Sequence, residues 1–178
     1  MNPVFAAEAD GTLLGFLAER RGELIDFACA LVATPSPNPP GDERAVAALV
    51  VDKLRALGIG RIDTVGANEA RPNVIARVGS TARPALVLCG HLDTKPPGDL
   101  SQWRLDPYGA SIEDGELYGL GSGDMKGAVA AMVFALSVEK RPLSVMKLTV
   151  TPSGAGLPVK VTSSAVMMVE GSAQMTVC

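Results

Sequence analysis

Apolar positions along the first third of the chain recur at helical spacing. Over residues 12–32, leucine, isoleucine, alanine and valine return every three or four positions, which predicts a helix. The prolines of residues 34–41 prevent it from continuing, so an irregular loop is expected there. A second helix is predicted over residues 43–57, with Asp42 as its N-terminal cap and Gly58 closing it.

Short apolar runs then replace the helical pattern. They predict β-strands over residues 59–65, 73–78 and 85–89, and the last run is short and apolar enough for a buried, central parallel strand. The turn signal Asp114–Gly115 predicts a hairpin. Residues 125–138 predict a helix with alanine and methionine at its apolar positions, and the alternation of helices and strands favours a layered α/β fold.

The end of the chain has a different pattern. Residues 143–150 fit one further strand, whereas residues 151–178 carry prolines and glycines between short Val, Thr, Ser and Met runs, with no helical spacing. This tail is expected to pack poorly and to leave the edge beside the central strand partly exposed.

Composition narrows the class of protein. A chain of 178 residues with 47% hydrophobic content fits one globular domain. Its 16 basic and 19 acidic residues give a net charge of −3, which argues against a nucleic-acid partner. No apolar run approaches the ~20 residues of a membrane span, and the start lacks the basic region of a secretory signal. Three scattered cysteines, with Cys29 and Cys89 expected as buried free thiols, favour a cytoplasmic location.

Metal-binding residue types follow the strand predicted over residues 85–89. His91 and Asp93 lie just beyond its carboxyl end, where open α/β sheets place their active sites. In extended backbone the two side chains lie on the same side, so one can bind a metal while the other orients the imidazole ring. Asp124 follows in a glycine-rich turn, and its two carboxylate oxygens could bridge two metal ions.

Structural roles compete with this interpretation. His91 could be a core or loop histidine satisfied by the backbone, and Asp124 could merely cap the following helix. The glycines of residues 119–123 fit neither a dinucleotide-binding fingerprint nor a P-loop. Other conspicuous residues are expected to serve packing, or in the case of the lysine to be solvated on a helix: Trp103, Tyr108 and Lys126.

Several short segments taken together resemble a known family. Residues 90–94, 97–99, 106–107, 117–119 and 123–127, with Trp103 and Asp114–Gly115, look like the aminoacylase / acetylornithine deacetylase / succinyl-diaminopimelate desuccinylase / carboxypeptidase G family of zinc metallopeptidases. Residues 71–76 are similar to the strand that precedes the metal motif there, and the resemblance covers roughly residues 22–138. It implies the N-terminal part of a zinc-peptidase-like three-layer α/β/α catalytic domain, without the lid or dimerisation domain.

The resemblance also implies an activity and a site. The family uses two zinc ions, sometimes cobalt or manganese, to hydrolyse amide bonds in small substrates such as N-acyl amino acids or dipeptides. Carried over by motif, His91 would ligate one metal, Asp124 would bridge both, and Asp93 would be the catalytic residue that orients His91. The implied partner is a small-molecule amide or peptide, with no nucleic acid or membrane. The family is often dimeric, but the domain that dimerises is not recognised here.

Departures from the family pattern change the expected activity. The family's general-base glutamate and its neighbouring ligand glutamate have no counterpart in residues 148–156, and the single histidine leaves no second histidine ligand. Ala128 stands where many members have glycine. Residues 1–140 are therefore expected to be the N-terminal portion of the catalytic domain, and residues 141–178 a tail from a shifted frame or truncated gene. The expected function is an incomplete, weak or inactive hydrolase; the alternative is a non-catalytic pseudoenzyme fragment.

Overall fold

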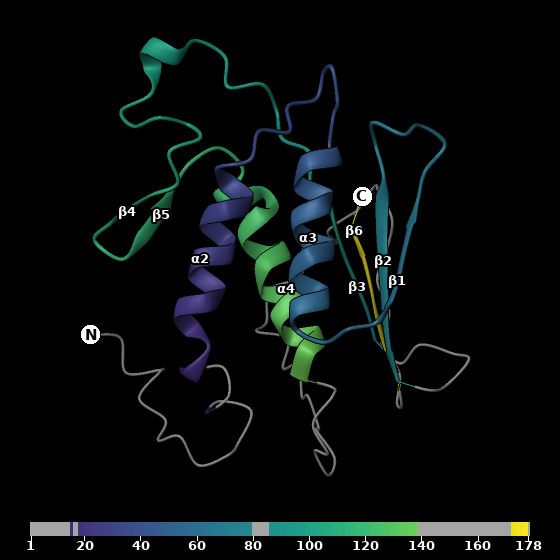
Figure 1. Ribbon diagram of the computed structural model, residues 1–178. Coiled ribbons are helices and arrows are strands. Elements are labelled where there is room, and N and C mark those ends of the chain that lie inside the picture. The colour runs from purple at the N-terminus through teal and green to yellow at the C-terminus, as the bar shows by residue number, and fades with distance from the viewer. Residues whose placement is uncertain (1–14, 16–17, 80–85, 139–171, 178) are drawn as a thin grey trace, which may run out of the picture.

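The computed structural model describes residue 15 and residues 18–79, 86–138 and 172–177, drawn in colour in Figure 1. The strand predicted over residues 143–150 lies outside these residues, as do most of the tail and Cys178.

Three helices pack together on one face of a sheet (Figure 1). They are α2 (Arg21–Val32), α3 (Arg44–Ala56) and α4 (Gly127–Val138). All three were predicted, although the part of the first helix prediction before residue 18 is largely outside the described residues. Gly58, with φ of +78°, ends α3 in the left-handed region as expected.

The core forms where these helices meet the sheet. Helix α3 presents an apolar stripe at helical spacing, and α2 and α4 contribute Phe27 and Phe134, whose ring centroids are 6.4 Å apart. Burying a leucine or phenylalanine side chain contributes about 1.5–3 kcal/mol. Fully buried apolar side chains therefore hold the helical layer and the sheet together, among them Leu31, Val46, Val50, Leu54, Val74, Leu92, Val133 and Phe134.

Within the described residues the sheet has four strands in the order β1-β2-β6-β3. Strand β1 (Arg61–Val65) pairs antiparallel with β2 (Asn73–Gly79), β2 pairs antiparallel with β6 (Ser172–Val177), and β6 pairs parallel with β3 (Leu86–Gly90). The predicted hairpin forms a separate two-stranded sheet from β4 (Ser111–Glu113) and β5 (Glu116–Tyr118).

Strand β6 corrects two expectations about the tail and the central strand. Residues 172–177 insert between β2 and β3, so this part of the tail pairs with one edge of β3 instead of leaving both edges open. Within the described residues, β3 is consequently an outer strand, and Val87, Leu88 and Cys89 are half-buried rather than buried. The paired residues are 87 positions apart in sequence for β3 and β6, and 93–103 apart for β2 and β6, which no local pattern reveals.

These elements establish a mixed α/β fold, as predicted. The described residues contain the sheet and the helical layer on one of its faces, which are two of the three layers expected. Cys29 and Cys89 are half-buried instead of fully buried as expected. None of the helices in the described ranges combines the length and hydropathy that a membrane span requires.

Candidate metal centre

His91, Asp93 and Asp124 come together at the carboxyl end of β3. His91 Nδ1 lies 3.0 Å from the backbone carbonyl of Asp93 and 3.2 Å from its carboxylate Oδ1. His91 Nε2 lies 3.0 Å from Oδ1 of Asp124. The structure thus brings the three residues singled out in the sequence into one cluster, with the two aspartates on opposite nitrogens of the imidazole.

Both imidazole nitrogens of His91 face acceptor oxygens. In the tautomer that carries its hydrogen on Nδ1, Nδ1–H donates to Asp93. A neutral ring then presents the lone pair of Nε2 to the carboxylate of Asp124. Two acceptor atoms facing each other at 3.0 Å are stable only with a proton or a cation between them.

The facing pair suits a metal ion. Ligand nitrogen and oxygen atoms about 2.0–2.1 Å from a tetrahedral zinc ion are roughly 3.3 Å apart. The observed 3.0 Å needs only a few tenths of an ångström of adjustment. The side chain of Asp124 is 90% exposed, which leaves its second oxygen accessible. However, no group of three or more His, Cys, Asp or Glu residues that could hold a metal is found among the described residues.

Asp93 is itself held by residues that the motif analysis did not assign. Its Oδ2 accepts a hydrogen bond of 2.8 Å from Asn38 Nδ2 and lies 3.7 Å from the guanidinium of Arg71. Arg71 Nε in turn donates to Oε2 of Glu43, which is 2% exposed. A chain of charges therefore runs from Glu43 through Arg71 and Asp93 to His91, the arrangement that orients a metal-binding imidazole. In the sequence, the proline-rich loop and the Arg71–Pro72–Asn73 segment were the features that could have pointed to Asn38 and Arg71.

Asp124 lies in an irregular turn before α4. Residues Ser122–Lys126 form a π-helical turn, within which Asp124 and Met125 have non-helical backbone angles and are joined by a cis peptide bond. Helix α4 consequently starts at Gly127, two residues later than predicted. Asp124 faces His91 instead of capping α4, contrary to the structural alternative considered for it.

Lys126 differs from its predicted surroundings. It was expected to be a solvated helix residue, but it is fully buried, and its Nζ donates a hydrogen bond of 2.7 Å to the carbonyl of Thr34. Burial lowers the pKa of Lys126 to about 8. The prediction failed because the irregular turn directs the side chain inward, whereas a regular helix start was assumed.

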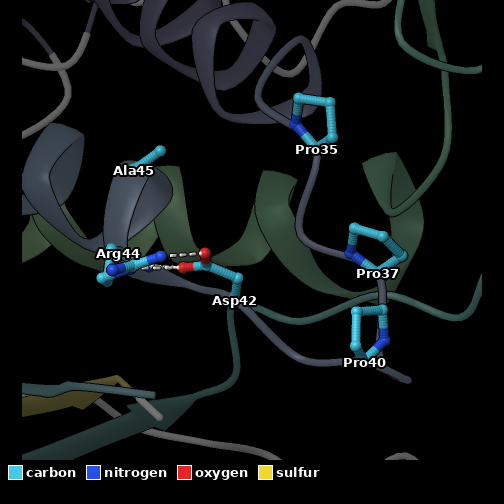
Figure 2. Close-up of a pocket in the computed structure, with 6 residues that line it drawn as sticks. All are labelled: Pro35, Pro37, Pro40, Asp42, Arg44 and Ala45. Carbon is cyan, nitrogen blue, oxygen red and sulfur yellow. Dashed lines mark hydrogen bonds and ion pairs between the residues drawn. The ribbon is translucent and has the colours of Figure 1, made fainter. Parts of the chain in front are cut away.

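Two pockets lie on neighbouring loops, and neither includes His91 or Asp124 in its lining. One, of about 440 Å³, is lined by Trp103 and Tyr108 among others, which are half-buried packing residues as expected. The other, of about 350 Å³, lies between the proline-rich loop and the start of α3 (Figure 2). There Arg44 donates to both oxygens of Asp42, and these hydrogen bonds lower the Asp42 pKa to about 2. Because the charges of Arg44 and Asp42 are paired with each other, the surface that this pocket presents to a ligand consists mainly of proline rings.

A family model matches part of the chain. Residues 87–152 match the model described as peptidase family M20/M25/M40. The predicted family resemblance is confirmed. The matched residues include His91, Asp93 and Asp124, and the M20 family is one of hydrolytic enzymes.

Individual relatives agree with this result. A succinyl-diaminopimelate desuccinylase of Methylobacterium nodulans is 41% identical over 109 residues, which are 60% of this chain and 27% of the relative. The enzyme of the same name from Xanthomonas campestris is 39% identical over 120 residues, 64% of this chain and 29% of the relative. The chain thus spans less than a third of the length of these relatives.

Solved structures show the same fold. An M20 family metallo-carboxypeptidase from Sulfolobus solfataricus superposes with a TM-score of 0.61 at 21% identity, over 89% of this chain and 30% of that one. Human carnosine dipeptidase 1 superposes with a TM-score of 0.60 at 24% identity, over 91% of this chain and 32% of that one. The described residues therefore have the fold of part of an M20 catalytic domain.

Proposed function

We propose that this chain carries part of the metal centre of an M20-type hydrolase that cleaves amide or peptide bonds in small substrates. The observation that supports this most directly is the pair His91 Nε2 and Asp124 Oδ1, which oppose each other at 3.0 Å while Asp93 holds the other imidazole nitrogen. The name of a structurally similar Bacillus subtilis protein, a dinuclear metal-binding peptidase of this family, agrees with a two-metal site.

Each residue has a distinct role in the proposal. His91 Nε2 and the carboxylate of Asp124 would hold the metal, and Asp93 would keep the ring in the Nδ1–H tautomer. Bound zinc, or cobalt or manganese in its place, polarises an amide carbonyl and acidifies water. The side chain of Asp124 is 90% exposed, so a small substrate can approach from the solvent side.

The proposed substrates are N-acyl amino acids or dipeptides. The desuccinylases named above favour an acyl amino acid, whereas the carboxypeptidase and dipeptidase favour a peptide. We place the catalytic portion in residues 1–140 and treat residues 141–178 as a tail, although the family model extends into its first residues, to residue 152. Because such substrates are small and soluble, we propose a cytoplasmic location and no membrane or nucleic-acid partner.

The donor count limits the activity that we expect. A structural or catalytic zinc ion needs three or four protein ligands, and the described residues bring two together. We therefore infer weak metal binding and little or no hydrolysis by the chain alone. The same count favours an alternative, a non-catalytic fragment that retains the metal-binding half of the site.

A metal titration of the purified chain tests the proposal. Calorimetry with Zn²⁺ and Co²⁺ should give weak, substoichiometric binding that disappears in His91→Ala and Asp124→Asn. Asp52→Asn is the matched control, because Asp52 is an exposed aspartate on α3, and this variant should bind like the parent. Metal binding that survives His91→Ala would refute the site. Two tightly held ions per chain would show that the chain has a full set of metal ligands, contrary to the proposal. Assays with N-succinyl and N-acetyl amino acids and dipeptides then separate the hydrolase from the non-catalytic alternative.

A further inference from the structure

The burial of Lys126 needs a physical explanation. Its side chain is 0% exposed, and its Nζ donates to the carbonyl of Thr34 at 2.7 Å. Removing an ammonium group from water is costly, and an apolar side chain of similar volume would fill the same space at lower cost. A gain in stability therefore does not account for a lysine at this position. The hydrogen bond that its Nζ makes is the property that an apolar side chain would lack.

The accepting carbonyl belongs to a loop that also holds the His91 segment. Within loop 34–38, the Ser36 hydroxyl donates to the carbonyl of Leu92 at 2.6 Å, and Asn38 Nδ2 donates to the Asp93 carboxylate at 2.8 Å. The backbone of the loop adds two hydrogen bonds to the residue after Asp93, at 2.8 and 2.9 Å. Loop 34–38 is thus fixed to the strand end that carries His91.

The turn that carries Asp124 approaches the same segment closely. The backbone N–H of Lys126 donates to the carbonyl of Gly121 at 2.8 Å and closes the turn. Gly121 has φ of +82°, and a Cβ there would lie 2.6 Å from Cγ2 of Thr94. Within the described part of the chain, however, His91 is the hydrogen-bonding partner of the Asp124 carboxylate, whose side chain is 90% exposed. The position of Asp124 therefore depends on how its turn is anchored.

From these contacts we infer that Lys126 is a positioning residue for the metal centre. Its Nζ ties the Asp124 turn to loop 34–38, and that loop is tied to the His91 segment, so the link sets the separation of His91 Nε2 and Asp124 Oδ1. This inference rests on the proposed metal site. Lys126 acts through the backbone and does not touch the metal or the substrate.

Replacement by methionine tests the role directly. Lys126→Met keeps the volume of the stem and removes the hydrogen bond, so the unfolding midpoint should stay the same or rise. Cobalt affinity should fall by about 10–100-fold, as it does when other residues that hold metal ligands in position are replaced. Lys95→Met is the matched control, because Lys95 is an exposed lysine two residues after Asp93, and it should change neither quantity.

A metal-free measurement separates this inference from the proposed function. His91 is the single histidine of the chain, so its imidazole ¹⁵N and ¹H resonances are unambiguous. Asp124→Asn defines the shift caused by losing the charged partner of Nε2. Lys126→Met should move the His91 resonances in the same direction, and Lys95→Met should leave them in place. If the parent binds no cobalt, the proposed function fails, while these resonances still decide the role of Lys126.

Other outcomes overturn the inference. Unchanged His91 resonances and cobalt affinity in Lys126→Met would show that the lysine does not position Asp124. If Lys126→Met does not fold, Lys126→Gln, which keeps an N–H donor, should give His91 shifts between those of the parent and Asp124→Asn. Failure of both variants to fold would assign Lys126 to stability alone and refute the positioning role.

Discussion

Glu43 is a buried carboxylate that depends on one partly exposed arginine. Its Oε2 lies 3.3 Å from Arg71 Nε, and its buried Oε1 has no hydrogen-bond partner in the part of the chain that the structure describes. Arg71→Ala would leave this charge buried and unpaired, so the free energy of unfolding should fall by about 1–3 kcal/mol. Chemical denaturation measures the change. In a Glu43→Gln background, where no charge needs compensation, the same arginine substitution should cost clearly less.

A second arginine provides the control for this prediction. Arg44 pairs with Asp42 on the surface, with side-chain exposures of 65% and 49%. Exposed ion pairs contribute little to stability because solvent screens them, so Arg44→Ala should have a small effect. Equal losses for Arg71→Ala in the parent and in the Glu43→Gln background would show that Glu43 does not depend on Arg71.

At the scale of the element, the turn before α4 depends on a glycine for two reasons. Gly121 has positive φ, and an added Cβ would collide with Thr94 at 2.6 Å. Gly98 has φ of +69° but open space around the Cβ position. Gly98→Ala should therefore cost only the backbone strain, about 1 kcal/mol, whereas Gly121→Ala should cost a further 1–3 kcal/mol, roughly, for overpacking. Equal thermal shifts in the two variants would mean that the turn does not press against Thr94.

At the scale of the molecule, β6 joins the two halves of the sheet. Thr176 pairs with Ile75 of β2 and Cys89 of β3, whereas Thr64 lies in the outer strand β1 and pairs with Val74. Proline removes a backbone donor and is tolerated mainly at sheet edges. Thr176→Pro should therefore lower the unfolding midpoint much more than Thr64→Pro. Equal effects, or a silent Thr176→Pro, would show that β6 is not the strand between β2 and β3.

The sequence by itself determined the local elements and the identity of the central cluster. Helices and strands follow from side-chain periodicity and from proline and glycine positions, which act over a few residues. His91 and Asp93 share a strand end and a face, so their closeness followed from a spacing of one residue. Asp124 was recognisable because its motif matches the family, although no spacing rule brings residues 33 positions apart together.

Only the tertiary structure decided what surrounds that cluster. Asn38 and Arg71 reach Asp93 from separate loops, Lys126 is buried because an irregular turn directs it inward, and β6 enters the sheet from the other end of the chain. Each of these contacts joins segments far apart in sequence. Their formation depends on how the helices and strands pack, because loop closure and burial are properties of the whole chain and leave no periodic signal in it.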